Sequence, residues 1–158
     1  EIMPSLVGSE MCIRDSINTD DTEILRLEPL TKFPVVEDLI VDRSVIWERQ
    51  KEALMYLGIR KHPDPKEHDH QYSAAKCLKC GLCLEVCPNY LGAKDDFYGA
   101  EFVNNAYLLH SSSLNRKRAL EKQYEEHFAK QCSKSLACRD ICPAHLQTLS
   151  SISYMNRR

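Results

Sequence analysis

Four cysteines lie close together in the middle of the chain, at a spacing that suits a metal cluster. Cys77, Cys80, Cys83 and Cys87 follow the pattern C-x2-C-x2-C-x3-C, and Pro88 comes directly after the last of them. Thiolates at this spacing hold iron–sulfur clusters, three on one cluster and the fourth on a second. The two-residue gaps suit a loop around a cubane, whereas the three-residue gap is one helical turn and directs Cys87 elsewhere. The motif therefore predicts half of a two-cluster site.

A second cysteine motif, with the sequence CSKSLACRDICP, stands further along the chain. It contains Cys132, Cys138 and Cys142, and Pro143 follows the last cysteine. The frame is that of the first motif with one ligand missing, because Ser135 stands where the second cysteine would be. Four cysteines in one motif and three in the other suit one four-iron and one three-iron cluster.

The ligands are expected to cross between the two motifs. The set for a [4Fe-4S] cluster is Cys77, Cys80, Cys83 and Cys142, and the set for the other cluster is Cys87, Cys132 and Cys138. A neutral serine hydroxyl is a poor substitute for a thiolate at such a site. We therefore expect a [3Fe-4S] cluster beside Ser135, and a serine-ligated [4Fe-4S] cluster stays open as the alternative. Structural zinc sites usually combine two separated C-x2-C pairs, which these motifs do not match.

Composition limits the classes of protein that the chain can represent. Its 158 residues are 43% apolar, which permits a core, and the net charge of −2 argues against nucleic acid as a partner. No run of 18 or more apolar residues occurs. Seven of the eight cysteines lie in the two motifs, and this odd number, without a secretory signal, favours thiolate ligands in a reducing compartment over disulfides.

The N-terminal part of the chain differs from the rest. Residues 1–16 include SLVGSEMCIRDS, which resembles translated adaptor sequence; a disordered N-terminus is the alternative, and Cys12 is not counted as a ligand. Residues 24–42 are rich in Ile, Leu and Val, which predicts short strands near 24–28 and 35–41. Two strands alone do not make a stable domain. We therefore expect residues 17–42 to be the remnant of a larger domain.

From residue 43 to residue 158 the apolar pattern predicts a small helical domain that contains the clusters. Helices are expected over 44–57, 98–110 and 115–130, and a short one after Pro143. The polar segment 60–71, with its three histidines, indicates a solvated linker rather than a metal site. The expected apolar positions are Ile46, Trp47, Leu54 and Leu57; Phe102, Val103, Ala106, Tyr107 and His110; Ala119, Leu120, Tyr124 and Phe128; and Leu146, Leu149 and Ile152. The fold class is mainly α.

From about Leu27 to its C-terminus the chain resembles the iron–sulfur subunit of succinate dehydrogenase and fumarate reductase. The resemblance is carried by LEPLTKFPVVEDLIVDRS, by KCLKCGLCLEVCPN and by the C-x5-C-x3-C-P spacing of the second motif. It implies an α-helical ferredoxin domain preceded by a short β remnant of a plant-ferredoxin-like [2Fe-2S] domain. The family's ligands fall on the same seven cysteines. No C-x4-C-x2-C run precedes Cys77, so a [2Fe-2S] cluster is expected only in an intact subunit, of which this chain would be an inactive fragment.

The resemblance implies a role in electron transfer. Single electrons would pass between a flavoprotein subunit and the quinone side of membrane-anchor subunits, at the cytoplasmic face of a membrane, while the flavoprotein acts on succinate or fumarate. Ser133 and Ala144 stand where relatives often have histidine and lysine, and no tryptophan follows Pro88, so quinone contact is left open. The alternative is a dicluster electron carrier of another complex, of the heterodisulfide-reductase kind, although such proteins usually keep four cysteines in both motifs.

Overall fold

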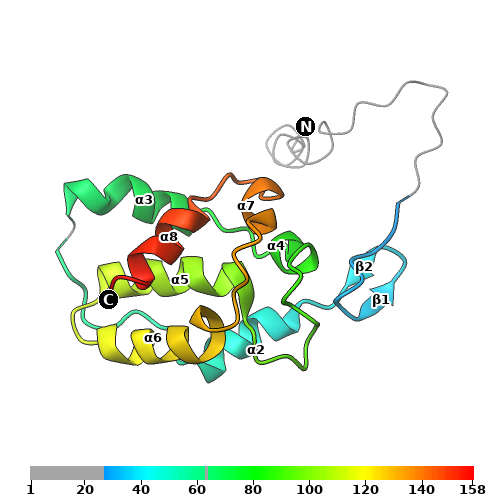
Figure 1. Cartoon of the computed structure of the whole chain (residues 1–158), viewed down its shortest axis with the longest axis horizontal. Coiled ribbons are helices and arrows are strands. Elements are labelled where there is room, and N and C mark those ends of the chain that lie inside the picture. Colours follow the sequence, from blue (N-terminus) through cyan, green and yellow to red (C-terminus); the bar gives the residue numbers. More distant parts are fainter. Residues whose placement is uncertain (1–26, 63) are drawn as a thin grey trace, which may run out of the picture.

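The structure, a computed structural model, describes residues 27–62 and 64–158, in which a small sheet precedes a helical body (Figure 1). The strands are β1 (Val35–Glu37) and β2 (Ile40–Val41). The helices are α2 (Ser44–Glu52), α3 (Pro65–Ala75), α4 (Leu82–Glu85), α5 (Gly99–Ser112), α6 (Lys117–Tyr124), α7 (Ala137–Asp140) and α8 (Thr148–Met155), with a π-helical turn, η1 (Glu125–Ala129), after α6. The prediction of a mainly α fold with a short β segment before it is confirmed. None of the helices in the described part is long and apolar enough to cross a membrane.

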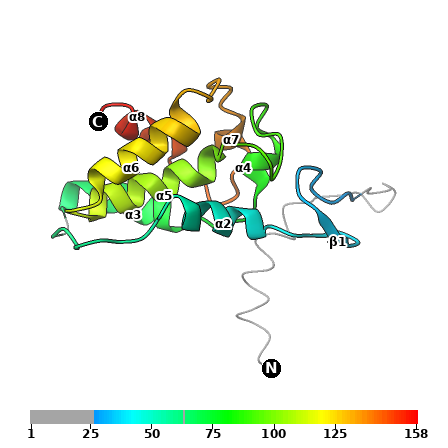
Figure 2. The same ribbon diagram turned by 90° about the horizontal axis from the view of Figure 1, so that it is seen from below.

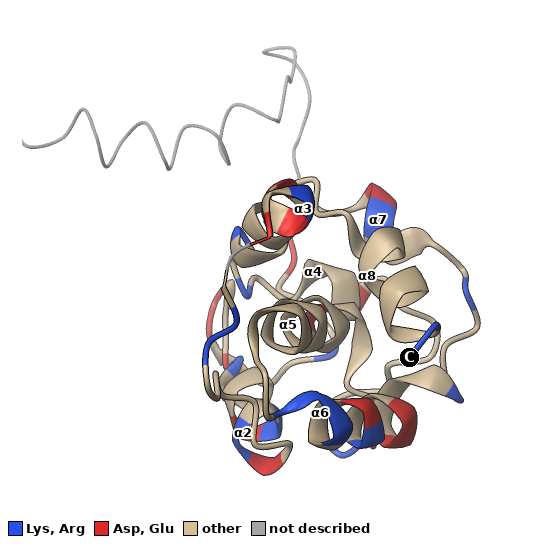
Figure 3. Ribbon diagram, turned by 90° about the vertical axis from the view of Figure 1, so that its left-hand side faces the viewer, with Lys and Arg blue, Asp and Glu red and all other residues tan. Residues whose placement is uncertain are grey.

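Helix α5 lies at the centre of the helical body. It contacts α3, α4, α6 and α8, and Figure 3 shows it with the other helices around it. The face predicted from its apolar spacing is buried, with each member at most 1% exposed: Phe102, Val103, Ala106, Tyr107 and His110. Burial of large apolar side chains is the main stabilising term in such a core. The central helix of the domain is thus the one that lies between the two cysteine motifs in the sequence.

The segment predicted as a strand near 35–41 is instead a hairpin. β1 pairs antiparallel with β2, with Val35 opposite Val41, and Asp38 between them takes a left-handed backbone (φ +48°). Asp adopts this conformation at low cost, which allows the chain to reverse. The hairpin lies outside the helical body, at the end where α4 and α7 lie (Figures 1 and 2). Residues 24–26 of the other predicted strand, and the segment 1–16 with Cys12, lie outside the described residues; residues 27 and 28 form no strand.

Helix α2 is shorter than predicted and buries a different face. It ends at Glu52, and Leu54 takes a left-handed backbone (φ +50°), so residues 53–57 are not helical. Ile46 is buried, but Trp47, Leu54 and Leu57 are exposed, which makes that part of the prediction wrong. The buried polar member of this helix is Arg49, whose guanidinium donates hydrogen bonds to carbonyl oxygens of the loop after the first motif.

The predicted linker over residues 60–71 is wrong, because most of it belongs to α3. The carboxylate of Asp64 accepts a hydrogen bond from the Lys66 backbone N–H (3.0 Å), and Pro65 occupies the first helical position. His70 stacks on Tyr107, with ring centroids 3.8 Å apart.

The buried positions predicted for the segment 115–130 are confirmed for Leu120, Tyr124 and Phe128, whereas Ala119 is exposed.

Candidate iron–sulfur cluster site

The two cysteine motifs adopt the same backbone path. In the first motif Lys79 and Gly81 have positive φ (+53° and +85°), and at the corresponding positions of the second motif Lys134 and Leu136 do too (+58° and +65°). A left-handed backbone is costly for any residue with a Cβ. Positive φ at the same two positions of both motifs therefore indicates that the two loops share one backbone conformation.

A single helical turn follows each loop and carries the next cysteine away from it. Helix α4 contains Cys83 and ends two residues before Cys87, and α7 contains Cys138 and ends two residues before Cys142. Equivalent hydrogen bonds close the turns, from Cys87 N to the carbonyl of residue 84 (3.2 Å) and from Cys142 N to that of residue 139 (3.4 Å). The predicted helical turn in each three-residue gap is confirmed. Because α4 and α7 contact each other, the ends of the two motifs are brought together.

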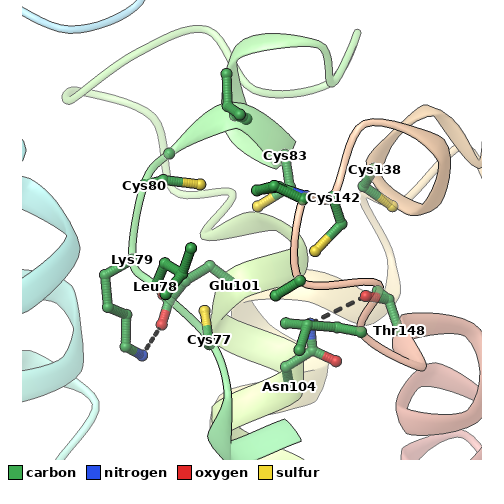
Figure 4. A pocket seen from close by; sticks show the side chains of 15 residues that line it. Cys77, Leu78, Lys79, Cys80, Cys83, Glu101, Asn104, Cys138, Cys142 and Thr148 are labelled. Atoms are coloured by element: carbon green, nitrogen blue, oxygen red, sulfur yellow. Dashed lines mark hydrogen bonds and ion pairs between the residues drawn. The ribbon is translucent and has the colours of Figure 1, made fainter. Parts of the chain in front are cut away.

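A first cavity is lined by cysteines of both motifs. Cys77 follows α3, Cys80 lies in the loop, Cys83 is on α4 and Cys142 follows α7. In Figure 4 the sulfur atoms of these four residues face one shared space, whereas the sulfur of Cys138, which also borders the cavity, points away from it. The structure therefore brings together the four residues that the sequence groups for a [4Fe-4S] cluster.

A second cavity lies on the other side of Cys138. Its lining includes Cys87 of the first motif, Cys132 and Cys138 of the second, and Ser135. These three cysteines are the set that the sequence groups for the second cluster, and each is half-buried. Cys138 borders both cavities, so the direction of its side chain, rather than proximity alone, separates the two sets.

The electrostatics of the thiols suit a cationic partner. Burial raises the pKa of Cys77 and Cys138, and it raises the pKa of Cys83 well above the ordinary thiol value. Charges on neighbouring cysteines act in the same direction, because thiolates close together repel one another. Coordinated iron deprotonates thiols and offsets this repulsion. A set of four soft sulfur donors around an apolar space fits an iron–sulfur cluster. Among the described residues, no three His, Cys, Asp or Glu side chains lie close enough to hold a single metal ion.

Polar groups of α5 also line the first cavity, and their position was not predicted from the sequence. Glu101 and Asn104 are both buried, and Asn104 donates a hydrogen bond to Thr148 Oγ1 (3.0 Å). Glu101 forms an ion pair with Lys79, which lies between two cysteines of the first motif. Their three-residue separation places Glu101 and Asn104 on one helix face. Only the packing of α5 against α4 and α8 shows that this face borders the cavity.

Residues of the segment before α2 hold the first motif from outside. Lys32 Nζ donates to the carbonyl oxygen of Cys87 (2.6 Å), and Arg43 Nη1 donates to that of Cys80 (3.3 Å). The carboxylate of Glu85, on α4, accepts hydrogen bonds from the backbone N–H groups of Thr31 and Lys32 (2.9 and 3.0 Å). Thr31 and Lys32 fall in the other predicted domain (residues 17–42), so their contacts with the first motif were not predicted.

Comparison with known proteins agrees with the chemistry of the motifs. Residues 73–146, which include all seven cysteines of the two motifs, match the family described as the 4Fe-4S dicluster domain. Residues 73–146 are therefore similar to a dicluster domain, and this similarity supports iron–sulfur clusters as the cofactors of the two motifs.

Curated relatives match over most of the chain. The succinate dehydrogenase iron-sulfur subunit of Bacillus subtilis is 32% identical over 144 residues, which cover 84% of this chain and 56% of the relative. The fumarate reductase iron-sulfur subunit of Wolinella succinogenes is 25% identical over 149 residues, which cover 85% and 62%. The chain thus spans less than two thirds of these relatives. The resemblance to succinate dehydrogenase and fumarate reductase iron–sulfur subunits is confirmed.

Proposed function

We propose that the chain transfers single electrons through two iron–sulfur clusters as part of a succinate dehydrogenase or fumarate reductase complex. Iron–sulfur clusters, when bound, supply one-electron redox chemistry at potentials set by their surroundings. The observation that carries the proposal is the grouping of Cys142, from the second motif, with three sulfurs of the first motif around one cavity. The names of the relatives support the same role.

The proposed ligands divide between the two cavities. Four thiolates would hold a [4Fe-4S] cluster: Cys77, Cys80, Cys83 and Cys142. Three would hold a [3Fe-4S] cluster: Cys87, Cys132 and Cys138. Ser135 lines the second cavity at the position that Cys80 has in the first motif, and its hydroxyl is a weaker iron ligand than a thiolate. The protein's own contribution is to fix the sulfurs, to exclude water from the first cavity and to surround both with hydrogen-bonded backbone.

The proposed partners follow from the resemblance. A flavoprotein subunit would exchange electrons with the chain on one side, and membrane-anchor subunits, with a quinone, on the other, at the cytoplasmic face of a membrane. We place residues 17–42 with a preceding [2Fe-2S] domain and residues 43–158 with the cluster-bearing domain. Exposed apolar side chains on the hairpin, among them Val36 and Ile40, support a further protein surface against that segment.

Electron paramagnetic resonance (EPR) of the reconstituted chain tests the proposal. The oxidised protein should give an S = 1/2 signal of a three-iron cluster, and reduction should add the signal of a four-iron cluster. Ser135→Cys supplies a fourth thiolate and should abolish the three-iron signal by admitting a fourth iron. Ser133→Cys adds a thiol at a position where the first motif has Leu78, and it should leave the three-iron signal in place. A chain that binds zinc but no sulfide would overturn the proposal.

A further inference from the structure

A buried ion pair forms part of the wall of the first cavity. Glu101 on α5 is 4% exposed, and its Oε1 contacts Nζ of Lys79, from the loop between Cys77 and Cys80 (Figure 4). Gln50 Nε2 on α2 donates a second hydrogen bond to the same oxygen (2.7 Å). Burial raises the pKa of Glu101 above the ordinary carboxyl value, and the contacts with Lys79 and Gln50 act against that rise. Burying an unpaired charge is costly, so this arrangement keeps a negative charge where an apolar residue would pack more cheaply.

Both members of this pair line the first cavity together with Cys77, Cys80, Cys83 and Cys142. The ammonium group of Lys79 lies 5.8 Å from the centre of the Trp47 ring, which is 51% exposed. The carboxylate of Glu101 is carried by the buried face of α5. The wall of the first cavity therefore includes a buried carboxylate beside the four cysteines.

We propose that Glu101 is a positioning residue that lowers the reduction potential of the cluster held in the first cavity. The proposal rests on the function proposed above. When the cluster is reduced, it gains one electron and no bond forms or breaks, so the reduced state carries one more negative charge. A fixed carboxylate at the cavity wall opposes that charge, and the opposition is strong because little water screens it. Lys79 and Gln50 hold the carboxylate in place and favour its ionised form against the effect of burial.

A purely structural role for the pair is the competing explanation. The contacts join α2, the first motif and α5, and such a link could serve only to hold these three elements together. Glu101→Gln separates the two explanations, because glutamine has nearly the same shape and accepts a hydrogen bond from Gln50 but carries no charge. Glu101→Asp keeps the charge and changes the length.

The test is a redox titration of the reconstituted full chain, followed by the EPR signal of the reduced four-iron cluster. Glu101→Gln should raise the midpoint potential by a tenfold change in the redox equilibrium or more, which is about 59 mV for one electron. Glu101→Asp should stay near the unmodified value. Glu121→Gln is the matched control: it removes a carboxylate of α6 that contacts His110, and it should not change the potential.

Iron and sulfide contents show that each variant holds its clusters. An unchanged potential in a fully loaded Glu101→Gln protein overturns the inference. If Glu101→Gln loses iron, the Gln50→Met variant is measured in its place. This change removes a donor that favours the carboxylate, so it should raise the midpoint potential, and an unchanged or lower potential overturns the inference. A chain without any cluster signal before mutation overturns the proposed function itself, and the two failures are thereby distinguished.

Discussion

The first cysteine motif (residues 77–88) and the second (residues 132–143) share a backbone but differ in what surrounds them. Gly81 of the first motif is buried against the ring of Phe33, and a Cβ at this residue would lie 2.9 Å from Phe33 Cζ. Its counterpart Leu136 is 39% exposed and takes the same left-handed backbone without that close contact. The first loop is thus enclosed by the segment before α2, whereas the second lies open.

Acidic residues at equivalent places in α4 and α7 show the same difference. Glu85 accepts hydrogen bonds from the Thr31 hydroxyl and from two backbone N–H groups of the preceding segment. Within the described part of the chain, Asp140 pairs with its neighbour Arg139 alone (2.7 Å), and both side chains are largely exposed. The shared cysteine spacing is therefore sufficient to give both motifs the same loop backbone. The neighbouring residues make the four-cysteine site enclosed and the three-cysteine site open.

The largest expected effect is the loss of one cluster from a change in the other motif. Cys87→Ser should remove the three-iron EPR signal while the four-iron signal persists, because Cys87 faces the second cavity although it belongs to the first motif. Cys142→Ser should do the reverse, because Cys142 lines the first cavity. Iron content and EPR of both variants measure this. Loss of the cluster that shares a motif with the mutated cysteine would show that the ligands do not cross.

A smaller effect is expected from exchanging the residues with left-handed backbone. Gly81→Ala should lower the free energy of unfolding by about 1–3 kcal/mol, because it combines backbone strain with a clash against Phe33. Leu136→Gly should change it by less than about 1 kcal/mol, because the relief of strain is offset by loss of a side chain that lines the second cavity. Chemical denaturation of the cluster-loaded proteins measures both. Equal responses at the two positions would mean that the loops do not differ in enclosure.

Local spacing was enough to predict much of this architecture. The cysteine intervals predict the helical turns of α4 and α7, and the apolar periodicity of residues 98–110 predicts the buried face of α5, because both depend on residues near one another in the chain. The fold class followed from the same patterns. The Asp64–Pro65 pair is also a local signal for the start of α3, but the charges and histidines that follow it led to a linker prediction.

Features that depend on distant partners could not be predicted. Helix α2 buries Arg49 because its guanidinium donates to carbonyl oxygens beyond the first motif, and no periodicity in residues 44–57 indicates those acceptors. The burial of Glu101 depends likewise on Lys79 and Gln50, from two other elements. Charged residues are usually counted as exposed. The burial of Arg49 and Glu101 was therefore not predicted from the sequence.

The smallest expected effect concerns the acidic residues of α4 and α7. Burial acts to raise the pKa of Glu85, but hydrogen bonds from Thr31 and Lys32 outweigh it and leave the pKa below its ordinary value. A carboxyl group with a lowered pKa in the folded state stabilises the fold above the unfolded pKa, near 4.5, and this contribution is lost as the pH falls through the folded pKa. Glu85→Gln should therefore lower the stability at pH 7, by less than about 1 kcal/mol because solvent screens the group.

The difference in unfolding midpoint between Glu85→Gln and the unmodified chain should narrow as the pH is lowered from 7 towards 4, because the protonated carboxyl and the amide are then alike in charge. Asp140→Asn is the matched control, since its ion pair is exposed and local, and it should leave the midpoint unchanged at every pH. If Asp140→Asn destabilised the chain as much as Glu85→Gln, the hydrogen bonds to Thr31 and Lys32 would not enclose the first motif. The contrast between the motifs would then lie in Ser135 and Leu136 alone.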